Sequence, residues 1–351
     1  MITDNKKPDV KRFILGLHGY MGSQPVLGVH DGGYCLADLS SKQVLVHVES
    51  EKFSGVRHDG RIYPNQVLQD LKEYVDSMEI ATSQFVSFRD EPRRIFPLVR
   101  DINPLTWDSK KNCLVEEIAF LGRSFVNHVY FHELAHVFSS YMYREKDHTR
   151  FLGWVVEGSG SFAQNSLFMI NGQEINLLSY NDPILSGMFF NRFLSNKIFD
   201  IPKEDFNARH ATPGKVMALA AYGDPCRYRQ PLLREIEKYQ SGQPINYRDF
   251  CPEILGAKLS WKDRIDLCAS GQALFEDLLE NQAHHIHKTY PDLPVYYSGG
   301  CALSIRANTK LRNIFNELVI PPNCGDDGQA LGLVALHTYL KYGSRLLPNI
   351  S

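Results

Sequence analysis

Two histidines one helical turn apart are the residues whose types and spacing most directly indicate chemistry in this chain. His132 and His136 frame the run His-Glu-Leu-Ala-His, which lies in a stretch with helical periodicity. Side chains four residues apart leave the same face of a helix, so both imidazoles can bind one cation. The spacing therefore predicts a metal-binding helix.

The same five residues fit two other interpretations. H-E-x-x-H is the signature of zinc proteases, in which Glu133 would be the general base and Glu157, in the later run Trp-Val-Val-Glu-Gly, the third ligand. The second interpretation is an amphipathic helix whose histidines merely pack against a core. The spacing favours a metal but leaves the function of that metal open. A protease does not need the glycine motifs near the C-terminus, so the rest of the chain must decide.

The elements around this helix are typical of an α/β protein. Strands are expected at residues 12–17, 25–30, 34–39 and 43–48, and a helix at 64–74. Residues 126–143 are expected to be helical, 151–156 to form a strand, and 166–290 to be mostly helices and loops. From residue 295 the pattern is strand, glycine turn, helix and strand, before a last helix at 329–342.

Length and composition predict two lobes and no strongly charged partner. A chain of 351 residues with 43% hydrophobic content exceeds the size at which single cores usually split. We expect a polar tail at 1–12, a first lobe at 13–165 and a second at 166–351. Because 38 basic residues face 40 acidic ones, no net field attracts nucleic acid or anionic lipid. The seven cysteines are scattered and no apolar run is long enough to span a membrane, so a cytoplasmic protein with reduced thiols is expected.

Four separated segments resemble the N-terminal domain of nodulation-type and antibiotic-tailoring O-carbamoyltransferases, which is related to the tRNA threonylcarbamoyl transferase. They are ILGLHGY with HDGGYCLADL and VESEKFSGVRHDGRIYP; HELAHVFSSY with VVEGSGS; PGKVMALAAYGD; and SGGCALSIRANTKL with VIPPNCGDDGQALGLVAL. The matches run in order from about residue 13 to 340. Ser304 and Glu157 stand where that family has Asn and Asp. The resemblance implies two ribonuclease-H-like lobes of the actin-like ATPase superfold.

The resemblance also implies a site. Its metal ligands would be His132, His136 and Asp326, a set that suits Fe(II) or Zn with open positions. ATP or carbamoyl-adenylate would be bound by Lys215, Gly299, Gly300, Asn308, Gly325 and Gly328. Glycines let backbone N–H groups approach phosphate, although ordinary turns use them as well. His30, Asp31 and His58 would position the acceptor or remove its proton.

The implied activity is a metal-dependent O-carbamoyl transfer. The carbamoyl group would move from carbamoyl-adenylate, made from carbamoyl phosphate and ATP, to a hydroxyl of a small molecule or sugar. Full-length family members carry a second, adenylate-forming domain, and this chain ends where that domain would begin. Either a separate adenylate-forming partner protein supplies the intermediate, or the activity differs; a homodimer is left open. The alternatives are a gluzincin-like zinc metalloprotease, a non-catalytic nucleotide-binding protein and, disfavoured by the near-neutral charge, a tRNA-modifying enzyme.

Overall fold

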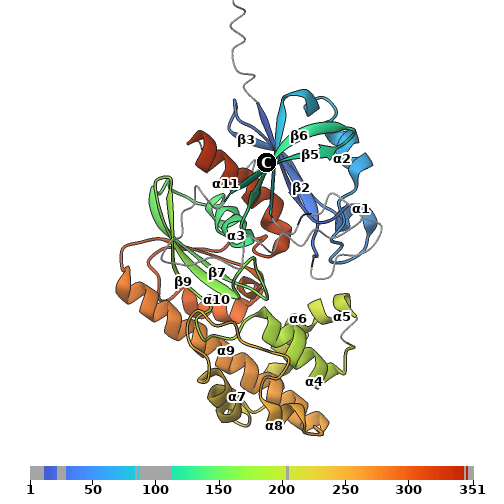
Figure 1. Cartoon of the computed structure of the whole chain (residues 1–351). Helices are drawn as coiled ribbons and strands as arrows, with labels where there is room; N and C mark the ends of the chain where they lie inside the picture. The colour runs from blue at the N-terminus through green and yellow to red at the C-terminus, as the bar shows by residue number, and fades with distance from the viewer. Residues whose placement is uncertain are drawn as a thin grey trace, which may run out of the picture. The chain divides into compact units, whose positions relative to one another are not determined.

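The computed structural model of the chain (Figure 1) describes residues 12–21, 29–83, 86, 113–202, 205–343 and 345–346. Most of the expected polar tail and part of the expected strand at 25–30 lie outside these residues. The described part forms two compact units. The first contains the residues up to 86 together with 113–143 and 326–346, and the second contains 144–325.

The first unit is built on a six-stranded sheet. Its strands are β1 (Phe13–His18), β2 (Gly33–Asp38), β3 (Gln43–Glu49), β4 (Met78–Ser83), β5 (Leu114–Phe120) and β6 (Arg123–Tyr130), in the order β3-β2-β1-β4-β6-β5. The first three strands form an antiparallel meander, and β4 and β6 then run parallel to β1. The helical elements are α1 (Glu51–Ser54), α2 (Pro64–Leu71), η1 (Val75–Ser77), α3 (His132–Tyr141), η6 (Asp326–Gly328) and α11 (Gln329–Tyr342).

The second unit repeats the arrangement of the five strands β3-β2-β1-β4-β6. Its strands are β7 (Arg150–Val156), β8 (Asn165–Asn171), β9 (Glu174–Tyr180), β10 (Val295–Ser298) and β11 (Leu318–Val319), in the order β11-β10-β7-β8-β9. Again an antiparallel meander is continued by two parallel strands. The helical elements are η3 (Phe189–Leu194), α4 (Ser195–Phe199), α5 (Phe206–His210), α6 (Thr212–Leu219), η4 (Ala220–Tyr222), α7 (Arg229–Ile236), α8 (Pro252–Leu255), α9 (Trp261–Thr289), η5 (Gly300–Leu303) and α10 (Ile305–Leu311). The α/β class with two ribonuclease-H-like lobes is confirmed.

Two expectations about secondary structure were wrong. The expected helix at 126–143 begins only at residue 132, because residues 123–130 alternate between exposed and buried positions and form the strand β6. Residues 165–180 form the hairpin β8–β9 rather than helices and loops. This hairpin pairs with β7, so the boundary between the units lies at 143/144 rather than 165/166, and the chain returns to the first unit at residue 326.

The last helix, α11, is a core element of the first unit. Its first eleven residues are all buried, which agrees with a sequence that is apolar around most of its circumference. The helix contacts α3 and the strands β1, β2 and β4 of the same unit. Figure 1 draws α11 in red and α3 in green. Each unit has its own apolar core. No helix among the described residues is both long and apolar enough to span a bilayer.

Candidate metal centre

The N-terminus of α3 carries the two histidines. β6 ends at Tyr130, and after the extended Phe131 the chain enters α3, whose first residue is His132. His136 follows one turn later on the same face. The two side chains are 2% and 0% exposed, and their Nε2 atoms lie 3.1 Å apart. Two imidazole nitrogens at this distance require a proton or a cation between them.

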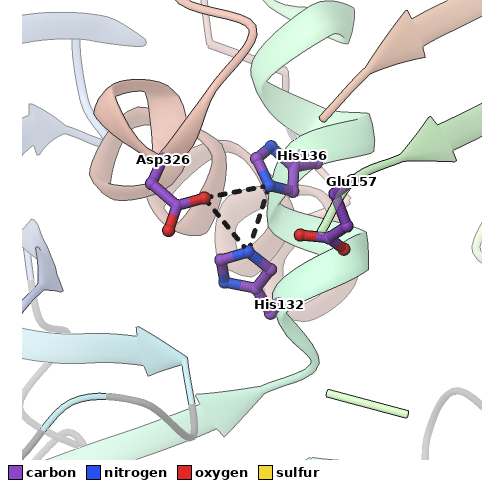
Figure 2. Close-up of side chains that lie close together, drawn as sticks. All are labelled: His132, His136, Glu157 and Asp326. Atoms are coloured by element: carbon purple, nitrogen blue, oxygen red, sulfur yellow. Dashed lines mark hydrogen bonds and ion pairs between the residues drawn. The ribbon is translucent and has the colours of Figure 1, made fainter. Parts of the chain in front are cut away.

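Asp326 supplies a third donor from a distant part of the sequence. It begins η6, the single turn before α11. Figure 2 shows its carboxylate beside the two rings, with Oδ1 at 3.2 Å from Nε2 of His132 and 3.3 Å from Nε2 of His136. Donor atoms separated in this way match ligands around one ion with bonds of about 2.0–2.2 Å. The residues therefore fit a divalent metal of the Zn or Fe(II) type.

The packing of α11 against α3 sets the position of Asp326. Gly332 lies so close to α3 that a Cβ atom there would overlap the backbone oxygen of Ala135. At the start of α11, the side-chain amide of Gln329 donates to the backbone carbonyl of His132 at 3.2 Å. These contacts hold the first turn of α11, and with it Asp326, against the histidine-bearing end of α3.

Four imidazoles of the first unit surround the Asp326 carboxylate. His132 and His136 face Oδ1, while Nε2 of His18 and Nε2 of His30 each lie 3.6 Å from Oδ2. Burial by itself would raise the pKa of Asp326, but the imidazoles of His132, His30 and His136 outweigh burial and hold the pKa well below its usual range. The carboxylate is therefore ionised, as a metal ligand must be.

Asp327, the residue after Asp326, resists ionisation. Burial, together with the carboxylates of Asp31, Glu49 and Asp326, raises the pKa of Asp327 to about 7. Burial is the first cause, and the three carboxylates add to it. A cation held by His132, His136 and Asp326 would act in the opposite direction and lower this pKa.

A second group of residues extends from the Asp326 carboxylate. Nδ1 of His30 lies 2.7 Å from Oδ2 of Asp31, and the other oxygen of Asp31 lies 2.9 Å from Nδ1 of His58. Burial opposes ionisation of Asp31, but the hydrogen bonds from both histidines outweigh it and its pKa falls well below the usual range. The carboxylate thus fixes the His30 ring with Nε2 directed toward Asp326.

The turns that carry this group are held in an unfavourable conformation. Asp31 and His58 have φ angles of 52° and 58°, in the left-handed region, which costs a side-chain-bearing residue about 1–2 kcal/mol. Such conformations persist where surrounding contacts enforce them, and they cluster at functional sites. The Asp31 bridge between the two imidazoles is one such contact.

The structure brings six of the sequence-predicted residues together in the first unit. They are His30, Asp31, His58, His132, His136 and Asp326. Gly328 lies in the same unit, as the N-cap of α11. The other predicted residues, Lys215, Gly299, Gly300, Asn308 and Gly325, belong to the second unit. There the exposed Lys215 ammonium lies 5.8 Å from the ring centre of Phe199.

Two of the predicted nucleotide-binding residues are engaged in local structure of the second unit. The backbone N–H of Gly299, which has a φ of 93°, donates to the carbonyl of Cys324 at 2.8 Å. The amide of Asn308 donates to the carbonyl of Ala302 at 2.7 Å. By contrast, a Cβ atom at Gly300 would meet no described atom within 4 Å. Gly300 is therefore the more accessible residue of the glycine pair.

Sequence reasoning missed two residues of the centre. His18 is the last residue of β1, 1% exposed, and faces both Asp326 and the backbone carbonyl of His30, the latter at 3.2 Å. Gln329 contacts the His132 carbonyl from the first position of α11. The available signal for His18 was a polar residue at the end of an otherwise apolar, buried strand, because such positions often face a site.

Comparison with known proteins identifies a family for this chain. The family model described as "Carbamoyltransferase N-terminus" matches residues 113–335. Among curated proteins, the nodulation protein NolNO of Sinorhizobium fredii is 25% identical over 334 residues, covering 87% of this chain and 45% of that protein. The nodulation protein NolO of Bradyrhizobium diazoefficiens is 27% identical over 196 residues, covering 52% and 33%. The chain thus spans less than half the length of these relatives.

The solved structures that match most of the chain share little sequence with it. HypF of T. kodakarensis has a TM-score of 0.48 at 12% identity, covering 95% of this chain and 48% of that one. Full-length HypF in a phosphate- and nucleotide-bound form has a TM-score of 0.44 at 13% identity, covering 94% and 56%.

Proposed function

The chain belongs to the carbamoyltransferase N-terminal family, and from this we propose that it transfers a carbamoyl group to a hydroxyl of a small molecule or sugar. A divalent metal, Zn or Fe(II), would be held by His132, His136 and Asp326. The observation that carries the proposal is the set of three donor atoms 3.1–3.3 Å apart within the segment that matches the family. When bound, the metal would polarise the carbamoyl oxygen.

The carbamoyl donor in this proposal is carbamoyl-adenylate, made from ATP and carbamoyl phosphate by an adenylate-forming domain or partner. Gly300 and Lys215 of the second unit are the residues proposed to meet its nucleotide part. An accessible glycine lets backbone N–H groups approach a phosphate, and a lysine ammonium neutralises its charge.

His30 is the proposed general base. The acceptor hydroxyl oxygen would attack the carbamoyl carbon, its proton would pass to Nε2 of His30, and the bond from that carbon to the adenylate phosphate would break, releasing AMP. Because Oδ2 of Asp31 lies 2.7 Å from Nδ1 of His30, the ring proton is assigned to Nδ1, and Nε2 is the nitrogen that would take the proton of the acceptor hydroxyl. Asp31 is a positioning residue in this scheme.

Replacement of Asp31 by Asn is expected to shift the pH profile of transfer as well as slow it. Burial lowers the pKa of His30, while the carboxylates of Asp326 and Asp31 raise it, with a net increase. Removing one carboxylate lowers that pKa, so the acidic limb of the kcat profile should move to lower pH. The rate loss should be smaller than the roughly 100- to 10,000-fold that loss of a general base costs.

Asp59 provides the matched control for this test. It is a buried carboxylate of the same region, but its partners are the backbone N–H of Arg61 and the hydroxyl of Tyr63. Asp59→Asn should leave the acidic limb in place. An Asp31→Asn enzyme with an unchanged pH profile would exclude the assignment of His30 as base.

The direct test is carbamoyl transfer by the metal-loaded chain. It would be incubated with carbamoyl-adenylate and a pool of small alcohols and sugars, and mass spectrometry would detect an acceptor that has gained one carbamoyl group. Transfer should be lost in His30→Ala and retained in Glu133→Gln. Peptide hydrolysis that depends on Glu133, without any carbamoyl product, would favour the zinc protease instead.

A further inference from the structure

A second cluster of metal-ligand side chains lies elsewhere in the first unit. Glu79 of β4, His128 of β6 and His337 of α11 place their donor atoms within 4.8 Å of one another. Nε2 of His337 lies 3.3 Å from Oε1 of Glu79, and Nε2 of His128 lies 3.5 Å from Oε2. These separations are those of neighbouring ligands around an ion with bonds of about 2.0–2.2 Å.

The cluster is distinct from the Asp326 centre. Glu79 pairs with Ile14 near the beginning of β1, whereas His18 ends that strand. Four residues of extended strand separate these positions by about 13 Å. Likewise, His337 lies eight residues beyond the first residue of α11, about 12 Å along the helix.

The sheet register and the α11 helix bring the three ligands together. Ala81 of β4 pairs with His128 of β6. Glu79, two residues before Ala81, therefore points to the same face of the sheet as His128. The helix α11 contacts β4, and His337 reaches this face from the helix. A cation here would link two central strands to the helix that carries Asp326 at its start.

The histidines are oriented as metal ligands are. The hydroxyl of Tyr130 lies 2.7 Å from Nδ1 of His337, and this contact fixes the ring so that Nε2 faces Glu79. Metal-bound histidines nearly always have such a partner at the other ring nitrogen. Nε2 of His337 is buried, and the polar atom it faces is Oε1 of Glu79 at 3.3 Å, so the two donor atoms are directed toward one another.

The cation now paired with Glu79 is Lys341, and the hydroxyl of Tyr342 donates to Oε1 of the same carboxylate. The Lys341 ammonium contacts Oε2 of Glu79 and lies 3.3 Å from Nε2 of His128. Because an ammonium only donates, this contact places the lone pair of His128 toward the centre of the cluster. Lys341 is 39% exposed, whereas Glu79 is 3% exposed. The side chain of Lys341 can thus rotate into solvent while Glu79, His128 and His337 keep their positions.

We propose that Glu79, His128 and His337 form a second divalent-cation site, of the zinc type, from which Lys341 is displaced when the metal binds. Two imidazoles and one carboxylate are a common zinc ligand set, with a fourth position open to water. The role of this ion is structural, because it joins β4, β6 and α11 at the end of the unit opposite Asp326. The inference is independent of the proposed transferase activity.

Zinc stoichiometry of the full chain tests this proposal separately from the first site. A His132→Ala/His136→Ala background removes the first site, and equilibrium dialysis against Zn²⁺ with elemental analysis should then find one ion per chain. Adding His128→Asn or Glu79→Gln should reduce this to none, with folding checked by circular dichroism. Tyr130→Phe should weaken binding by about 10- to 100-fold, the usual cost of losing a ligand's outer partner.

Two further variants separate a metal site from a closed ion pair. Lys341→Met should increase zinc affinity, since the competing ammonium is gone. His148→Ala should change nothing, although His148 has the same kinds of partner, Tyr296 and Glu317, in the second unit. A Lys341→Met chain that binds no zinc in the background variant would overturn the proposal and leave Lys341 as the permanent partner of Glu79.

Discussion

Replacing Asp326 with Asn is expected to remove the metal from the His132–His136 centre and to abolish carbamoyl transfer. The substitution keeps the shape of the side chain but removes the charge that faces both imidazoles at 3.2 and 3.3 Å. Loss of an outer partner of a ligand alone costs about 10- to 100-fold in metal affinity. Loss of a ligand should cost more than about 100-fold, measured as the metal content of the purified chain and as kcat.

Asp327→Asn is the matched control. Asp327 is the adjacent residue in the same turn, yet its own carboxylate resists ionisation, with a pKa raised to about 7 by burial and by the surrounding carboxylates. The centre should keep its metal in this variant. Metal that survives Asp326→Asn but disappears in Glu157→Gln would show that the third donor is Glu157, and the proposed ligand set would then be wrong.

Local patterns were sufficient to predict much of the first unit. β1, β2, β3 and α11 lie within one or two residues of their expected bounds, because continuous apolar runs and glycine turns are local signals. The spacing of His132 and His136 likewise predicted one helical face. The resemblance to a family, rather than any local pattern, connected Asp326 to them, since a contact between distant segments is set by packing.

The failures have physical causes. The pattern of the residues before His132 also fits a helix, whereas pairing with β4 and β5 makes them a strand. His18 was missed because its role depends on what faces the end of β1. Glu79, His128 and His337 are far apart in the sequence, so no short motif predicts their cluster. It arises from strand register and from the packing of α11.

Gly332→Val is expected to disturb the metal centre although no ligand is altered. At Gly332 a Cβ would overlap the backbone oxygen of Ala135 and would lie 3.0 Å from the backbone nitrogen of Ser139. Backbone atoms cannot rotate away as a side chain can, so α11 must move from α3. Overpacking of this kind costs about 1–3 kcal/mol, and the shift carries Asp326 away from the histidines.

The measurements for Gly332→Val are the free energy of unfolding and the metal affinity of the folded fraction, and both should fall. Gly214→Ala is the control, because a Cβ at this position in α6 meets no described atom within 4 Å. It should raise stability by about 0.5–1 kcal/mol through helix propensity and leave metal binding unchanged. Unaltered metal affinity in Gly332→Val would mean that η6 holds Asp326 in place without close contact between α11 and α3. In that case the position of the third ligand would be a property of the turn rather than of helix packing.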